Sequence, residues 1–232
     1  MLPEPAQSMV SYGDLRVRLS ALLRDVAPAE ADSLVVPACP EWTVTDTVAH
    51  LCGVGIDILD GNVTEAGTTA WADSHVERFA PLGLAVLLDR WADTGPSVEA
   101  LGPMFPPAIA AQIVFDATTH EHDIRGALGQ PGARDVDGIQ VGLEFLAVRL
   151  DETVRLHGFP TLQLTAPDWS AVVGDGAPQV EVEASTFEML RSFGGRRSAE
   201  QFGALDWSGD STPYLALFDD GPLRLRDDSL IE

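Results

Sequence analysis

The segment P-P-A-I-A-A-Q-I-V-F-D-A-T-T-H-E-H-D-I-R-G-A-L-G-Q-P, residues 106–131, combines the signals of one long helix with a dense cluster of ionisable groups. A Pro pair opens the segment, and a Gly followed by a Pro closes it, so we predict a helix over residues 108–128. Residues at positions i, i+4 and i+7 share one face of a helix. Asp116, His120 and Asp123 are therefore expected to project together.

A second helix, predicted over residues 43–61, carries a lone histidine in an apolar setting, His50. Paired with Asp116 and His120 of the first segment, His50 would complete a set of two imidazoles and one carboxylate. Three such ligands leave the fourth tetrahedral position of a zinc ion open for water or a thiol, which is the catalytic arrangement. The alternative is that His50 is a hydrogen-bonded core histidine and that Asp116 and His120 make an ordinary surface contact one turn apart.

Other residues near this cluster are expected to have supporting roles. His122 and Cys52 each lie about 200° around their helix from the neighbouring histidine, so we predict that neither is a ligand. Asp46 and Asp123 are expected either to accept hydrogen bonds from the ligating imidazoles or, alternatively, to cap a helix and pair with an arginine. The core is expected to include Trp42, Trp71 and Trp91.

The rest of the chain divides into two patterns. Apolar residues recur with helical spacing as far as about residue 157, which with short connections favours an up-and-down bundle. After Pro160 the period changes to two in T-L-Q-L-T-A, W-S-A-V-V-G and Q-V-E-V-E-A, which predicts a short antiparallel sheet carrying helices. We therefore predict an α+β protein with a helical domain over residues 1–158 and a small α+β domain over residues 159–232.

Composition excludes several classes of function. Fourteen basic residues, all arginine, against 36 acidic ones give a net charge of −22, which disfavours nucleic acid and acidic lipid surfaces as partners. The 45% apolar content is sufficient for a packed core. The sequence shows neither a membrane-spanning apolar run nor a secretory signal, and its two cysteines are too few for a disulfide framework. A cytoplasmic protein is expected.

Two motifs resemble a known family. C-P-E-W-T-V-T-D-T-V-A-H-L, residues 39–51, is similar to the C-P-x-W-[ST]-V-x-D-x-x-x-H-L signature of the mycothiol-dependent maleylpyruvate isomerases. D-A-T-T-H-E-H-D-I-R-G-A-L-G, residues 116–129, resembles the second motif of that family, [DE]-x-x-x-H-x-W-D-x-x-x-A-L-G. The chain departs from it at His122, where the family has Trp, and at Asp116, where the isomerase itself has Glu.

The resemblance implies a DinB-like four-helix bundle with a divalent metal, zinc, held by His50, Asp116 and His120. It also implies mycothiol as a thiol cosubstrate and a small-molecule substrate, with either a monomer or a homodimer in solution. In such an isomerase the metal lowers the pKa of the bound thiol, and the thiolate adds to a conjugated diacid, permits rotation about the former double bond, and leaves.

Arg196 matches the G-R position of the family, which implies that its guanidinium orients an anionic substrate or thiol. The alternative for Arg196 is a structural ion pair. Two other functions remain open for the whole chain. One is a non-catalytic module that binds metal or a small molecule, and the other is a hydrolase that uses metal-bound water on the same scaffold.

Overall fold

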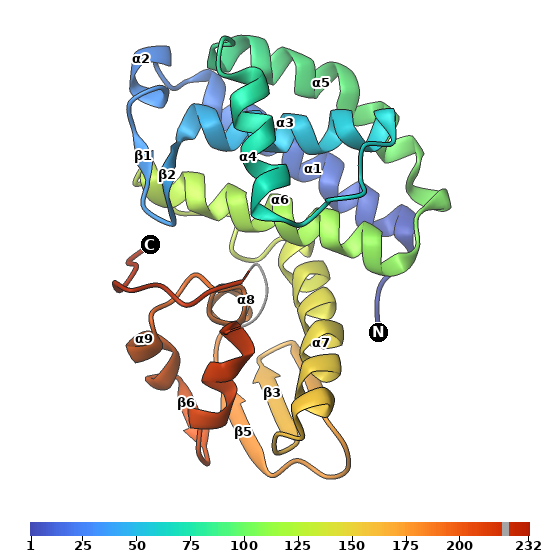
Figure 1. Cartoon of the computed structure of the whole chain (residues 1–232), viewed down its shortest axis with the longest axis vertical. Helices are drawn as coiled ribbons and strands as arrows, with labels where there is room; N and C mark the ends of the chain where they lie inside the picture. Colours follow the sequence, from blue (N-terminus) through green and yellow to red (C-terminus); the bar gives the residue numbers. More distant parts are fainter. Residues whose placement is uncertain (220–222) are drawn as a thin grey trace. The chain divides into compact units, whose positions relative to one another are not determined.

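The computed structural model describes residues 1–219 and 223–232 (Figure 1). The chain forms two compact units: a helical unit, Pro3–Gly132 with Glu232, and a sheet unit, Ala133–Ile231 with Met1–Leu2. The predicted α+β class is confirmed, with a helical N-terminal part followed by a small sheet part. The elements of the helical unit are α1 (Pro5–Arg24), α2 (Pro28–Ala31), β1 (Val35–Val36), β2 (Cys39–Thr43), α3 (Val44–Asp60), α4 (Thr69–Phe79), α5 (Leu84–Ala100), η1 (Gly102–Met104) and α6 (Pro107–Ala127).

Local sequence signals fix both ends of α3. The Thr43 hydroxyl accepts a hydrogen bond from the Asp46 amide, and the Asp46 carboxylate accepts one from the Thr43 amide at 2.9 Å, so the two residues form a capping box. Gly61 ends the helix in the left-handed conformation, at φ 73°. Thr43 and Gly61 were predicted as the limits of this helix. Helix capping was one of the two roles expected for Asp46, and the capping box shows that role.

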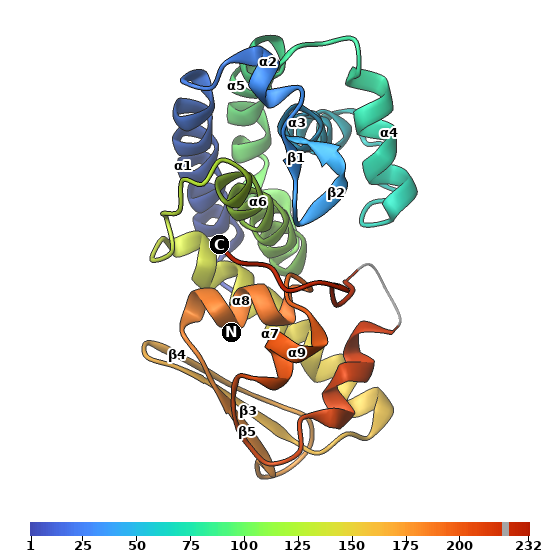
Figure 2. The ribbon, with the colours of Figure 1, turned by 90° about the vertical axis from the view of Figure 1, so that its left-hand side faces the viewer.

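Four helices, α1, α3, α5 and α6, build the bundle, and α4 packs on α3 at the outside (Figure 2). The bundle core is apolar, with Leu15 and Leu19 of α1 and Val48 of α3 fully buried. Trp91 of α5 is also fully buried, as predicted, and its indole donates a hydrogen bond to the Tyr12 hydroxyl at 2.9 Å. None of the described helices has the length and apolar character needed to cross a membrane.

In the sheet unit, strands run in the order β4-β3-β5-β6. The expected antiparallel arrangement is confirmed for the pair β3–β4 but wrong for β3 and β5, which are parallel. The fourth strand, β6, was not predicted, and it pairs antiparallel with β5. After β4 the chain returns to the opposite side of β3, so the third strand runs in the same direction as the first. The strands are β3 (Leu162–Ala166), β4 (Trp169–Val173), β5 (Val180–Glu183) and β6 (Asp206–Ser208).

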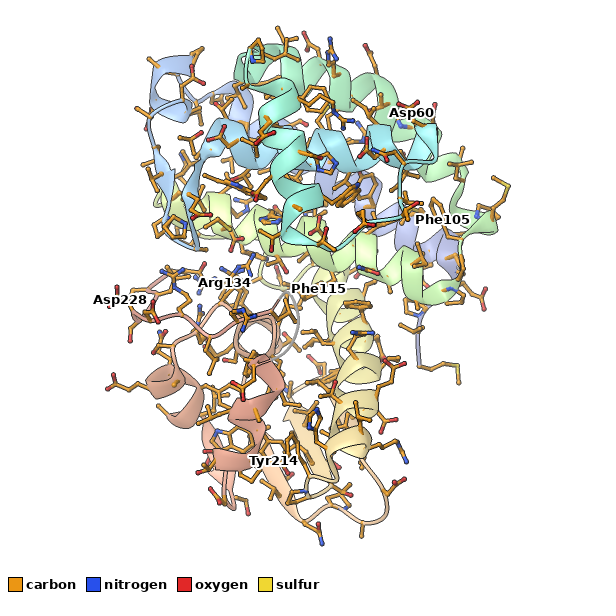
Figure 3. The ribbon with its side chains drawn as sticks, viewed as in Figure 1. Asp60, Phe105, Phe115, Arg134, Tyr214 and Asp228 are labelled. Atoms are coloured by element: carbon orange, nitrogen blue, oxygen red, sulfur yellow. The ribbon has the colours of Figure 1, made fainter. Side chains whose placement is uncertain are left out.

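The helices of the sheet unit are α7 (Asp137–His157), α8 (Thr186–Phe193), α9 (Ala199–Gly203) and η2 (Thr212–Phe218). α7 packs against β4 and α8, which places this helix in the sheet unit, whereas the sequence pattern placed residues 138–157 with the preceding helices. Tyr214 of η2, labelled in Figure 3, is fully buried and donates a hydrogen bond to the Pro160 carbonyl at 2.8 Å.

Candidate metal centre

Two helices of the helical unit bring the three predicted ligands together. α3 supplies His50, and α6 supplies Asp116 and His120 one turn apart. Asp116 Oδ2 lies 3.4 Å from His50 Nε2, and Asp116 Oδ1 lies 3.7 Å from His120 Nε2. Both imidazoles are buried, whereas the Asp116 side chain is 35% exposed. The cluster therefore has a buried imidazole side and an accessible carboxylate side.

The spacing of these three groups fits a small divalent ion. Zinc bonds of about 2.0–2.1 Å in tetrahedral geometry place neighbouring ligand atoms about 3.4 Å apart. The two contacts of Asp116 are close to that separation, and one ligand atom from each of the three residues lies within 4.8 Å of the others. Two imidazoles with one carboxylate also form a donor set of the type found at catalytic zinc sites.

The second nitrogen of the His120 ring, Nδ1, contacts a carboxylate of the same helix. Asp123 Oδ2 lies 3.1 Å from His120 Nδ1, and the Cys39 thiol donates to the same oxygen at 3.6 Å. The contact with the imidazole corresponds to one of the two roles expected for Asp123. Cys39, His120 and Asp123 also have the composition of a ligand group, but one oxygen of Asp123 already contacts both the His120 ring and the Cys39 thiol.

The charges around His120 alter its protonation. Burial alone would lower the pKa of its imidazole, but the hydrogen bonds with Asp123 and Cys39 and the negative charge of Asp116 outweigh it and raise the pKa to about 10. Without a metal, the ring is therefore an imidazolium between two carboxylates. A metal ion at Nε2 must displace that proton.

The His50 ring contacts a second buried histidine, His75, which the sequence did not single out. His75 of α4 is fully buried, and its Nδ1 lies 3.2 Å from His50 Nδ1. Its Nε2 lies 3.0 Å from Asp57 Oδ2, so Asp57 contacts His75 and not His50 directly. Burial lowers the pKa of His75 more than Asp57 raises it. The Thr68 hydroxyl that caps α4 was the available sequence signal for this helix.

Aromatic rings border the two ligating imidazoles. The Trp42 ring centroid lies 5.2 Å from that of His50 and 5.8 Å from that of His120. Trp71 meets His50 edge-on at 6.3 Å. Both indoles are only partly buried, so the expectation that Trp42 and Trp71 are core residues is wrong. They lie beside the imidazoles because the segment before α3 and the first turn of α4 lie next to His50.

The other ionisable residues singled out in the sequence take separate positions. Cys52 is fully buried, and burial raises the pKa of its thiol to about 11. His122 is buried as well. Among the described residues, the ligand groups include neither of them.

Arg196 lies in the sheet unit on the turn after α8. Gly195 adopts φ 74°, and a Cβ at this position would come within 2.8 Å of the Arg224 carbonyl oxygen, so the turn requires glycine. Arg197, the next residue, is buried and donates from Nε and Nη2 to Glu188 at 2.6 and 2.9 Å. Arg196 is partly exposed, and its Nη1 lies 3.4 Å from the Gly194 carbonyl oxygen. Arg197 of this turn thus forms an ion pair with Glu188 of α8.

Comparison with known proteins relates this geometry to one family. The sequence profile of the mycothiol maleylpyruvate isomerase N-terminal domain matches residues 12–125, which include all three candidate ligands. Crystal structures of the mycothiol-dependent maleylpyruvate isomerase share the fold. A histidine-to-alanine mutant aligns with a TM-score of 0.60 and 15% identity over 89% of this chain and 93% of that one. A second structure of the isomerase gives 0.56 at the same identity and coverage. No curated protein sequence gives a significant match. Residues 12–125 of the chain therefore match the N-terminal domain of the mycothiol maleylpyruvate isomerase family.

Proposed function

We propose that the chain is a cytoplasmic, zinc- and mycothiol-dependent isomerase or transferase that acts on a small conjugated acid. The observation that carries the proposal is the convergence of His50, Asp116 and His120 with the outer nitrogen of each imidazole engaged elsewhere. This arrangement leaves both Nε2 atoms directed at Asp116, as metal ligation requires. The match of residues 12–125 to the N-terminal domain of that family supports the choice of thiol and of reaction class.

The residues present suit a thiolate better than a neutral ligand. When bound, the metal would bind the thiol sulfur and lower its pKa, so that thiolate is abundant near neutral pH. Because only Asp116 among the three ligands is anionic, a divalent ion there keeps a net positive charge of about one, which attracts the thiolate. Trp42 and Trp71 offer apolar surface beside it and limit the access of water.

We also propose Arg196 as the group that recognises an anionic part of the substrate or thiol. The chain carries a net charge of −22, so a dicarboxylate is repelled at long range and needs a local cation. A guanidinium fork can bind a carboxylate through two parallel hydrogen bonds. Arg196 is partly exposed, whereas Arg197 is buried, which makes Arg196 the better candidate of the pair.

The proposal is tested by metal analysis followed by a thiol titration. We expect about one zinc per chain in the purified protein, lost in His50→Ala and His120→Ala and kept in the matched control His122→Ala. After cobalt replacement, mycothiol is expected to shift the visible spectrum, as sulfur enters the coordination sphere. Turnover of maleylpyruvate is then measured with and without mycothiol.

The alternatives give different results in the same experiments. A binding module would hold the metal without turnover, and a hydrolase would act without the thiol and leave the cobalt spectrum unchanged on adding mycothiol. Stoichiometric zinc in both histidine variants would contradict the ligand assignment itself.

A further inference from the structure

A continuous chain of hydrogen-bonding groups runs from His50 to the outside of the helical unit. His50 Nδ1 lies 3.2 Å from His75 Nδ1, and His75 Nε2 lies 3.0 Å from Asp57 Oδ2. The other carboxylate oxygen of Asp57 accepts a hydrogen bond from Arg78 Nη1 at 2.7 Å. We propose that His75 and Asp57 are positioning residues that fix the proton of His50 on Nδ1 and so keep its Nε2 free to bind metal. This inference rests on the proposed ligand role of His50.

Only one placement of the protons on His50 and His75 is compatible with metal binding by His50 Nε2. A ligating His50 Nε2 must present a lone pair, so the proton of His50 must be on Nδ1, where it can only be donated to His75 Nδ1. A neutral His75 then carries its own proton on Nε2, and that atom faces a carboxylate, which only accepts. With this placement, each donor in the series His50, His75 and Asp57 faces an acceptor.

Asp57 is held so that it continues to accept. Its carboxylate is fully buried, and it receives hydrogen bonds from Arg78 and from Asn62 Nδ2 at 3.0 Å. Burial would raise the pKa of Asp57, but the hydrogen bonds from Arg78 and His75 outweigh it and lower the pKa. An ionised carboxylate in this position accepts from His75 and cannot donate to it.

The packing of α3 against α4 shows that the position of His75 is specific. Gly53, one turn after His50, faces the His75 ring so closely that a Cβ there would lie 2.4 Å from His75 Cγ. Any larger residue would displace the ring, so this glycine makes room for the contact between the two histidines. The short Nδ1–Nδ1 distance is therefore built into the helix interface.

An isosteric change at Asp57 separates the proposal from simple packing. In Asp57→Asn the side-chain oxygen is expected to stay with Arg78, which only donates, so the amide NH2 faces His75 Nε2. His75 must then accept there and move its proton to Nδ1, opposite the proton that His50 needs. The same replacement behind a catalytic histidine of serine proteases also imposes the wrong tautomer.

Two variants of His75 provide the complementary test. His75→Asn places an amide oxygen near the former Nδ1 and keeps an acceptor for His50, whereas His75→Leu removes the acceptor. The matched control is Glu99→Gln, which also converts a carboxylate paired with an arginine, Arg16. Glu99 lies on α5, outside the series of hydrogen-bonding groups that begins at His50.

We expect zinc affinity, measured by competition with a chromogenic chelator, to fall about 10- to 100-fold in Asp57→Asn and His75→Leu. His75→Asn and Glu99→Gln should stay within about threefold of the wild type. Long-range ¹H–¹⁵N spectra of the imidazoles provide a readout that needs no activity. The His75 proton should be on Nε2 in the wild type, with and without zinc, and on Nδ1 in Asp57→Asn.

The proposal is overturned if His75 keeps its Nε2 proton in Asp57→Asn, or if His75→Asn and His75→Leu lose affinity equally. The second comparison applies even if Asp57→Asn does not fold. If the wild type binds no zinc, the proposed function fails, whereas the imidazole spectra still decide where the His75 proton lies.

Discussion

The apparent affinity of the metal centre should rise steeply with pH, because a metal ion and a proton compete for His120. With its pKa raised to about 10, His120 is protonated at pH 7, which is about three units below that pKa. A metal that binds at pH 7 must displace this proton. At 1.36 kcal/mol for each unit, this competition costs about 4 kcal/mol at pH 7. Each unit of pH should therefore increase the apparent zinc affinity about tenfold.

The assay is chelator competition at constant ionic strength between pH 6.5 and 8.5, corrected for the protonation of the chelator. The expected increase over this range is about 100-fold. Asp123→Asn removes the strongest contact that raises the pKa of His120, so its affinity curve should flatten within the same range. A wild-type affinity that stays constant from pH 6.5 to 8.5 would refute the reasoning.

The stability of the metal-free protein, in contrast, should fall as the pH rises. The pKa of His120 is above its ordinary value of 6.5, so protonation stabilises the fold fully below about pH 6.5. That contribution is lost as the pH rises towards about 10. Urea unfolding of the chelated protein at pH 6, 8 and 9.5 should show the decline, and His120→Gln should reduce it.

Three further substitutions have defined expectations. Thr43→Ala removes the cap of α3 and should lower the free energy of unfolding by about 1 kcal/mol in urea titrations, and no change would show that the cap is dispensable. Gly53→Ala forces a Cβ against the His75 ring and should destabilise the fold by about 1–3 kcal/mol, which differential scanning calorimetry can measure. Arg196→Lys keeps the charge and loses the guanidinium fork, so turnover should fall while zinc content and thermal stability remain. Full activity in that variant would exclude the proposed role.

Elements with local signals were predictable from the sequence, and α3 is the clearest case. Its Thr43 cap, the Asp46 capping box and the Gly61 terminus act within a few residues, so they need no knowledge of the fold. The same holds for the shared face of Asp116 and His120, which follows from helical spacing alone. The placement of these side chains was therefore predictable where the geometry is that of a single helix, and their role as metal ligands stays a prediction.

The features that were not predicted depend on distant parts of the chain. α4 buries only His75 and Phe79, so it lacks the apolar stripe that marks a packed helix. β5 pairs with β3 and not with β4, a choice that the alternating pattern of each strand cannot encode. Asp57 lies on α3 seven residues after His50, yet its link to His50 needs His75 from another helix.

The distribution of carboxylates around the candidate metal centre would allow so acidic a chain to retain a cationic site once a metal is bound. Asp116 alone among the nearby aspartates touches both ligating imidazoles, whereas Asp57 and Asp123 each lie behind a histidine ring. Asp57 is further neutralised by Arg78. A second carboxylate in direct contact with a divalent ion would cancel its charge and remove the attraction for a thiolate. Asp123 lies one imidazole ring from the candidate metal position, behind His120, and Asp57 lies two rings away, behind His50 and His75. At these positions the carboxylates would orient the imidazoles and leave the positive charge of a bound ion at the open position.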